Sequence, residues 1–146
     1  MADEGKHYTK GSEQIIIDYK GWKIKPLVCY DLRFPVWSRN TQKDKYDLLI
    51  YVANWPETRI IQWTKLLQAR AIENSAFVVG VNRIGTDASG KEYNGFSASV
   101  DYRGEAHTLE ENKEELRTVT INKSALEEYR EHFPVLEDGD TFELKD

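Results

Sequence analysis

The only cysteine of the chain, Cys29, stands between a short apolar run and a compact set of polar groups. Leu27 and Val28 precede it, and Asp31 and Arg33 follow soon after. If the apolar run is a buried strand, the thiol lies at its carboxyl end, where catalytic side chains gather because the strand fixes their position. A thiolate there is a nucleophile for acyl transfer. A buried, inert thiol is the alternative, because free cysteine behaves as a small apolar residue.

Nucleophilic use of this thiol requires a base that the local sequence does not supply. A free thiol has a pKa of ~8.5, so only a few per cent is thiolate at neutral pH. His7, His107 and His132 are far apart in the chain, and none lies near Cys29 in sequence. This scatter, with a single cysteine and no HExxH spacing, predicts no metal site. Glycine-rich phosphate loops and a GxSxG serine motif do not occur either.

Later apolar runs predict the elements that frame the site. Tyr46–Ala53 is typical of a central strand covered on both faces, and the polar and aromatic pair Asn54 and Trp55 follows it directly. Thr58–Asn74 has apolar residues at helical spacing and no glycine or proline, which predicts a helix. Ala76–Asn82 predicts another buried strand. Strands that alternate with helices predict an α/β fold.

Charged residues within these elements have structural interpretations of their own. Lys23 and Lys25 alternate with apolar residues in the expected strand Trp22–Val28, which predicts one solvated face. Arg70 and Glu73 lie close to the apolar stripe of the helix, where a surface pair is worth only a few tenths of a kcal/mol. Other expected elements are a hairpin turn at Lys20-Gly21, a half-exposed strand over Leu116–Ile121 and a short helix over Ser124–Arg130.

Composition and charge narrow the class of protein. A chain of 146 residues fits one domain, residues 1–146, and buries roughly two-thirds of its unfolded surface on folding. The formal net charge of -5 disfavours nucleic acid as a partner, because phosphate binding needs clustered Lys and Arg. The chain contains no run of ~18 apolar residues, so no membrane span is predicted. The amino terminus lacks the apolar stretch of a signal peptide, and one cysteine forms no internal disulfide, so a cytoplasmic location is expected.

The run Cys29-Tyr30-Asp31-Leu32-Arg33-Phe34-Pro35 resembles the nucleophile motif of the carbon–nitrogen hydrolase (nitrilase) superfamily. Further motifs of that superfamily recur in order, at the spacing that it shows. These are Asn54-Trp55-Pro56, Ala69–Asn74, Asn82–Gly85 and, at the carboxyl-terminal end, His132–Leu136. The resemblance covers nearly the whole chain and is greatest to the ω-amidases, which hydrolyse the terminal amide of 2-oxo-dicarboxylate monoamides. It implies the C-terminal half of a four-layer α-β-β-α sandwich.

The resemblance also implies a mechanism without a cofactor. Cys29 attacks the amide carbon to form a thioester, ammonia leaves, and water hydrolyses the acyl-enzyme. The backbone N–H of Tyr30 is implied as a donor to the oxyanion, a contribution of roughly 3 kcal/mol.

The substrate contacts that the resemblance implies are Arg33, Asn54 and Trp55. The guanidinium of Arg33 suits the substrate carboxylate, because its planar fork pairs with a carboxylate through two hydrogen bonds. An ion pair with Asp31 or Glu73 is the structural alternative for Arg33. Asn54 and Trp55 are implied to line the pocket, although core packing explains the tryptophan nearly as well.

The superfamily places a general-base Glu and an oxyanion-stabilising Lys before the nucleophile, and no lysine of this chain matches the position of that Lys. The resemblance therefore predicts that the N-terminal half of the domain, with both residues, is missing from residues 1–146. Glu4 matches a second glutamate that orients the site, and a solvated loop carboxylate is the alternative. Besides a small-molecule amide, the expected partner is a second copy in a homodimer or the N-terminal half.

Two functions of different class follow from these observations. The first is an amidase, with the substrate left open among an ω-amide, an N-carbamoyl compound and a nitrile. The second is a non-catalytic nitrilase-fold remnant or interaction module. The second is favoured if the base and the Lys are truly absent, because removing members of a catalytic unit costs several orders of magnitude in rate.

Overall fold

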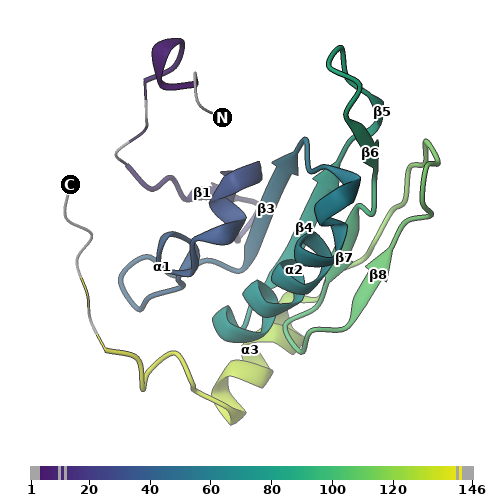
Figure 1. Cartoon of the computed structure of the whole chain (residues 1–146). Coiled ribbons are helices and arrows are strands. Elements are labelled where there is room, and N and C mark those ends of the chain that lie inside the picture. The colour runs from purple at the N-terminus through teal and green to yellow at the C-terminus, as the bar shows by residue number, and fades with distance from the viewer. Residues whose placement is uncertain (1–3, 10, 12, 141, 143–146) are drawn as a thin grey trace.

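A six-stranded mixed sheet, with strand order β1-β2-β3-β4-β7-β8, runs through the molecule, and β5 and β6 form a separate hairpin (Figure 1). The computed structural model describes residues 4–9, 11, 13–140 and 142. The elements are, in chain order, η1 (Glu4–Lys6), β1 (Ile17–Tyr19), β2 (Trp22–Val28), η2 (Cys29–Arg33), α1 (Pro35–Ser38), β3 (Leu48–Ala53), η3 (Glu57–Arg59), α2 (Ile60–Asn74), β4 (Phe77–Asn82), β5 (Ile84–Thr86), β6 (Glu92–Asn94), β7 (Ala98–Val100), β8 (Ala106–Thr108) and α3 (Lys123–His132).

The three central strands are parallel, so their carboxyl ends meet at one edge of the sheet. Val28 of β2 lies opposite Val52 of β3, which lies opposite Val81 of β4. Parallel neighbours need crossover connections, and α1 and α2 lie on the two crossovers. The outer strands β1, β7 and β8 pair antiparallel. This arrangement confirms the predicted α/β fold.

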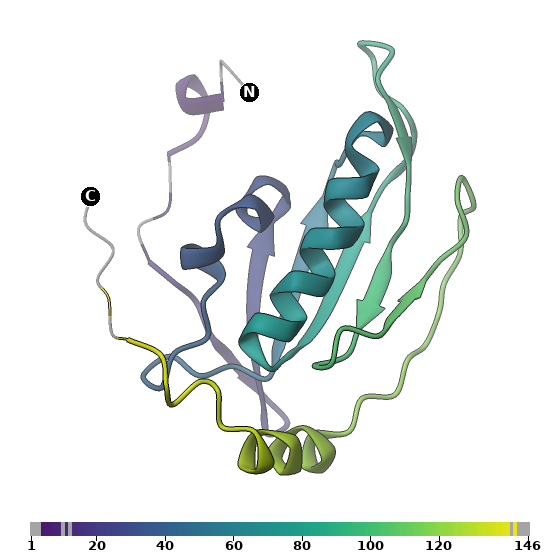
Figure 2. The ribbon, with the colours of Figure 1, turned by 60° about the horizontal axis from the view of Figure 1, so that its bottom comes forward.

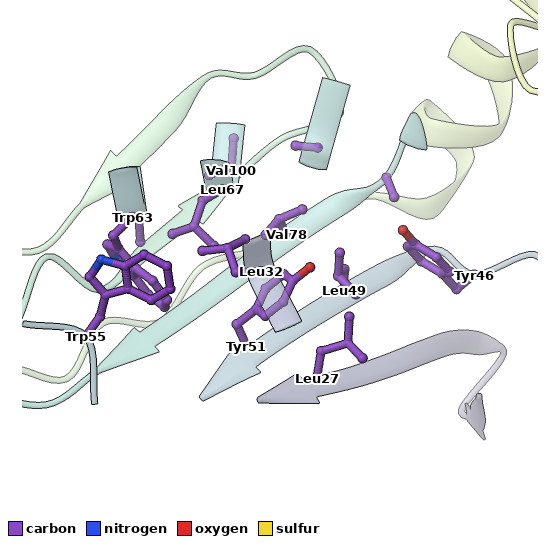
Figure 3. Close-up of a cluster of buried hydrophobic side chains, with 13 residues drawn as sticks. Leu27, Leu32, Tyr46, Leu49, Tyr51, Trp55, Trp63, Leu67, Val78 and Val100 are labelled. Carbon is purple, nitrogen blue, oxygen red and sulfur yellow. The ribbon is translucent and has the colours of Figure 1, made fainter. Parts of the chain in front are cut away.

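Helix α2 covers one face of this sheet in both ribbon views (Figures 1 and 2). Its residues Trp63, Leu67 and Ala71 are fully buried, which confirms the apolar stripe of the predicted helix. All three belong to the core cluster with the inward side chains of the strands, and Figure 3 shows Trp63 and Leu67 there. Gly80 allows this close approach, because a Cβ atom there would lie 2.6 Å from Leu67 Cδ1 and 2.7 Å from Trp63 Cζ2.

The opposite face of the sheet is covered only in part. Leu126 of α3 packs with Leu48 at the amino-terminal end of the strands. At the other end, Val28, Val52 and Val81 form a row across three strands and are 61%, 51% and 48% exposed. The prediction that the central strand is covered on both faces is therefore wrong at Val52. We call these three residues the valine row.

The predicted hairpin at the start of the sheet is confirmed. Tyr19 and Trp22 close the β1–β2 ladder on either side of the two turn residues. Lys20 and Gly21 both have positive φ, 48° and 81°. Two such residues form the turn whose twist matches that of the flanking strands.

The predicted strand over residues 116–121 is wrong. This segment pairs with no strand of the described sheet, and Leu116 is 96% exposed. Side-chain alternation gives a segment a strand-like pattern, but a strand also needs a neighbour to receive its backbone hydrogen bonds. The following helix is confirmed and is longer than predicted, because Asn122 caps it by accepting a hydrogen bond from the Ala125 N–H.

The predicted solvated face of β2 is wrong at Lys25, whose side chain is only 1% exposed. Its ammonium group donates to Gln14 Oε1 at 2.6 Å and to the Trp37 carbonyl at 2.8 Å. The same group lies 5.6 Å from the centre of the Tyr46 ring. The pKa of Lys25 is lowered to about 8, because burial disfavours the charged form more than nearby Asp44 favours it.

This buried amine predicts a pH dependence of stability. From about pH 8 to 10.5 the folded chain holds Lys25 neutral while the unfolded chain still binds the proton, so the free energy of unfolding should rise with pH. Lys25→Met should lack this rise, on the order of 2 kcal/mol. Urea unfolding at several pH values measures it, with the exposed Lys23→Met as control. Parallel pH profiles for wild type and Lys25→Met would contradict the prediction.

None of the helices in the described ranges is both long enough and apolar enough to cross a bilayer.

Candidate active site

The chain passes directly from β2 into η2 at Cys29, which is half-buried. The thiol therefore lies at the carboxyl end of a sheet strand, as the sequence predicts. Cys29 has φ 39°, a left-handed conformation that is rare for residues with a Cβ atom. Such backbone strain, of order ~1–3 kcal/mol, clusters at functional sites. Asp31 stabilises the turn, since its Oδ2 accepts a hydrogen bond of 2.9 Å from the Val28 N–H.

Helix α2 holds the loop after the thiol through Arg70. Its Nη2 donates to the Leu32 carbonyl at 2.6 Å, across 38 residues of sequence. Its Nη1 donates to Glu73 Oε1 at 2.9 Å, so the predicted i,i+3 pair exists. The pair is not a surface feature, because the Arg70 side chain is only 4% exposed. Arg70 is thus a positioning residue for the loop that follows Cys29.

A group of buried hydroxyls lies next to this loop. Ser38 Oγ and the Tyr51 hydroxyl are 2.7 Å apart, and the Tyr46 hydroxyl donates to the Ser38 carbonyl at 2.6 Å. Burial raises the pKa of Tyr51 to about 12, and it raises that of Tyr46 well above its usual value. Both phenols are therefore neutral near pH 7, and neither is suited to act as the base for a thiol.

Arg33 and Trp55 meet at the end of β3. The guanidinium carbon of Arg33 lies 4.6 Å from the centre of a Trp55 ring, and the guanidinium forms no ion pair with any carboxylate of the described residues. The alternative pairing with Asp31 or Glu73 is therefore not formed. Trp55 itself is buried, so its core-packing interpretation holds, while one of its rings supports the guanidinium.

Asn82 fixes the Trp55 loop. Its side-chain oxygen accepts from the Trp55 N–H at 2.7 Å, and its amide nitrogen donates to the carbonyls of Trp55 and Gly95 at 3.0 and 2.7 Å. The indole nitrogen of Trp55 donates to the Arg59 carbonyl at 2.8 Å. The Asn82 motif thus has a positioning role that its sequence neighbours do not reveal, because its partners lie on two other loops.

For the remaining predicted site residues the structure gives fewer side-chain contacts. Tyr30 directly follows Cys29 in η2, and its ring is exposed and lies edge-on to Phe34 at 5.1 Å. Asn54 is exposed at the end of β3. Glu4 begins η1, but its side chain lies outside what the structure describes, so its role in orienting the site stays a prediction.

Within residues 4–9, 11, 13–140 and 142, no three His, Cys, Asp or Glu side chains are grouped so that they could hold a metal ion. The strand ends bring together Cys29, whose backbone is strained, and the Arg33 guanidinium on the Trp55 ring. The loops that carry them are held by hydrogen bonds from Arg70 and Asn82. Such a set can support attack by a thiolate on an electrophile that carries a negative group.

Amidases are among the known proteins that this chain is similar to. The chain is 49% identical over 145 residues to the omega-amidase YafV of Escherichia coli (strain K12), and the match spans 99% of this chain and 56% of that one. It is 34% identical to the 2-oxoglutaramate amidase of Bacillus subtilis (strain 168), over 94% of this chain and 53% of the relative. The chain thus spans about half the length of these relatives.

The solved structures include XC1258 from Xanthomonas campestris, a CN-hydrolase superfamily protein with an arsenic adduct in its active site. The two folds superpose with a TM-score of 0.93 and 43% sequence identity, over 99% of this chain and 57% of that one. The family model for carbon-nitrogen hydrolases matches residues 2–131. This chain therefore belongs to the carbon–nitrogen hydrolase family.

Proposed function

We propose that this chain provides the nucleophile of an amidase that releases ammonia from 2-oxo-dicarboxylate monoamides. The observation that carries the proposal is Cys29, held at φ 39° at the end of a parallel strand by Asp31, with Arg70 bracing the loop that follows. An E. coli relative is an omega-amidase and a B. subtilis relative is a 2-oxoglutaramate amidase, which supports this substrate class. Arsenic bonds readily to thiols, so the adduct in the Xanthomonas protein is consistent with a reactive cysteine.

In the proposed reaction the Cys29 thiolate forms a bond to the amide carbon, and the C–N bond then breaks. The leaving nitrogen takes a proton and departs as ammonia. Water next attacks the thioester, which gives a carboxylate and regenerates the thiolate. The Tyr30 N–H donates to the oxyanion. The general-base Glu and the second oxyanion donor, a Lys, belong to the segment that the family places before the nucleophile, and Glu4 orients the site.

Arg33 is proposed to bind the substrate carboxylate. It extends from the loop after the nucleophile, and its guanidinium lies on the Trp55 ring without a carboxylate partner among the described residues. A planar fork held by an aromatic face is well oriented for a carboxylate, because less freedom is lost on binding. Asn54, exposed at the same strand end, is proposed to line the pocket.

The valine row is proposed to be covered by the remainder of the family domain. Parallel strands are normally buried on both faces, and these three side chains are 48–61% exposed on an apolar sheet face. The relatives contain nearly as much chain again beyond the matched part. Pairing with a polypeptide of that kind is the proposed assembly, and a homodimer is the other outcome. A cytoplasmic location stays a prediction.

The test is ammonia release from 2-oxoglutaramate, measured for this chain alone and for the chain with the complementary N-terminal segment of the E. coli relative. We expect turnover with the segment and little without it. A neutral amide, an N-carbamoyl amino acid and a nitrile serve as comparison substrates. Turnover of one of those instead would change the substrate class. A complex that forms but turns over none of the four would overturn the amidase and favour a non-catalytic module.

A further inference from the structure

An exposed guanidinium stands at the edge of the sheet that carries Cys29. Arg83 directly follows β4, and its N–H donates to the Ala53 carbonyl at the end of β3 at 3.2 Å. Cys29, Ala53 and Asn82 each come one residue after a member of the valine row, so Ala53 and Asn82 end β3 and β4, and Cys29 directly follows β2 beside them. Arg83 is the next residue after Asn82. The topology thus places Arg83 at the same strand ends as the thiol.

The β5–β6 hairpin presents this arginine on a rigid support. The Arg83 guanidinium carbon lies 4.7 Å from the centre of the Tyr93 ring, and Tyr93 is buried. The Tyr93 hydroxyl donates to Asp87 Oδ2 at 2.9 Å. Asp87 in turn accepts from the N–H groups of Ser89 and Lys91, at 2.9 and 3.0 Å, and so closes the hairpin turn. The ring beneath Arg83 is therefore fixed at both its face and its hydroxyl.

This support lies within electrostatic range of the nucleophile. The pKa of Tyr93 is raised, first by burial, next by the hydrogen bond and charge of Asp87, and to a smaller extent by the charge of Cys29, while Arg83 opposes the rise. A charge on Cys29 influences the phenol only if the two groups are close, because solvent screens distant charges. Strand β6 also contacts η3, which follows the Trp55 loop. The hairpin therefore borders the candidate active site.

The guanidinium of Arg83 forms few polar contacts with the described residues. Its one hydrogen bond, from Nε to the carbonyl of the adjacent Ile84, is 3.5 Å long. No described Asp or Glu forms an ion pair with it. Its side chain is exposed. An arginine of this kind keeps most of its five donors available for an anion.

We propose that Arg83, supported by Tyr93, is a specificity-determining residue that binds a carboxylate of the reagent or substrate attacked by Cys29. Arg33 reaches the end of β3 through Trp55, whereas Arg83 stands at the end of β4, so the two guanidiniums lie at neighbouring strand ends. Two guanidiniums there favour acyl groups that carry an anionic end over neutral ones of similar size. The inference deepens the proposed function and rests on it for Cys29 as the reacting group.

The test is the rate of Cys29 alkylation by iodoacetate, which is anionic, and by iodoacetamide, which is neutral. Cys29 is the only cysteine of the chain, so mass spectrometry follows one site. In Arg83→Gln the ratio of the iodoacetate rate to the iodoacetamide rate should fall roughly three- to fivefold, the effect of one solvent-screened charge. Arg83→Lys should keep part of the ratio, and added salt should lower the wild-type ratio.

The matched control is Arg103→Gln. Arg103 is also exposed and also lies over a tyrosine, 5.5 Å from the centre of the Tyr102 ring. It follows β7, which runs antiparallel to β4, so it stands at the opposite edge of the sheet. Its loss should leave the ratio unchanged, since the change in net charge is the same but the site is distant. An equal ratio in wild type and Arg83→Gln, or an equal fall in both variants, would overturn the proposal.

Alkylation separates this proposal from the amidase proposal. The iodoacetamide rate reports on the thiol itself, so a variant that disturbs Cys29 changes both rates and leaves the ratio unaltered. A ratio that depends on Arg83, with no amide turnover by the complex of the chain and the N-terminal segment, supports the anion site and contradicts the amidase. Amide turnover, together with an iodoacetate-to-iodoacetamide ratio that is the same in wild type and Arg83→Gln, supports the amidase and contradicts the anion site.

Discussion

Replacement of Cys29 by alanine is expected to lower ammonia release by at least about 10⁴-fold, in the preparation that turns over 2-oxoglutaramate. The reason is that no other described residue can replace the nucleophile. The nearby phenols of Tyr46 and Tyr51 are neutral, and the chain has no second cysteine. Ammonia release under saturating substrate measures the effect. Acid quenching during turnover should also give a covalent adduct on Cys29 in wild type and none in the variant.

The control for this experiment is the neighbouring residue. The proposed role of Tyr30 uses only its backbone N–H, and its ring is exposed. Tyr30→Phe should therefore retain ammonia release within about threefold of wild type, since it removes one hydroxyl from the surface. Appreciable turnover by Cys29→Ala would show that the reaction does not proceed through a thioester. A large loss in Tyr30→Phe would assign the phenol a role that the proposed reaction does not include.

Replacement of Arg130 by methionine is expected to lower the free energy of unfolding by about 3 kcal/mol, because it leaves a buried carboxylate short of its partner. Arg130 is buried and bonds to Asp47 Oδ1 at 2.9 Å. It also donates to the carbonyls of Ser75 and Tyr46, both at 2.8 Å. The residue thus ties α3 to the end of α2 and to the start of β3. Urea unfolding followed by tryptophan fluorescence measures the loss.

The matched control is Arg117→Met, which removes a side chain from the more exposed pair with Glu115, 3.3 Å apart. Its loss should cost less than about 1 kcal/mol. Burial acts to raise the pKa of Asp47, but hydrogen bonds from the Lys23 N–H, Lys123 and Arg130 hold it below its usual value. The lowered pKa of Asp47 adds stability at pH values above the pKa of an unfolded Asp, and this stability is lost as pH falls. On acidification, Arg130→Met should therefore unfold at a higher pH than wild type. Equal losses in both variants would contradict the buried-network interpretation.

The sequence by itself predicted most of what depends on local pattern. The run before Cys29, the buried strand after Tyr46 and the helix that ends at Asn74 were all predicted, because periodicity and turn residues act within a few positions of the chain. The motifs that resemble those of the nitrilase superfamily also indicated the family correctly. These features need no knowledge of distant neighbours.

Only the tertiary structure decided the environment of individual side chains. Lys25 lies in a segment where charged and apolar residues alternate, which is typical of a solvated face, yet its ammonium group bonds to Trp37 and Gln14. The segment after Leu116 alternates like a strand, yet it has no partner in the described sheet. The bond from Arg70 to the Leu32 carbonyl spans 38 residues. In each case the result depends on whether a remote segment makes a contact, and periodicity contains no information about such contacts.

The candidate site divides in the same way. The family resemblance in the sequence implied Cys29, Arg33 and Trp55 as site residues, and their roles stay predictions. The fold alone placed Arg33 on the Trp55 ring and Arg83 on the Tyr93 ring at one edge of the sheet. The physical reason is that parallel strands bring their carboxyl ends together from distant parts of the chain, so residues separated by about 50 positions lie at one edge of the sheet.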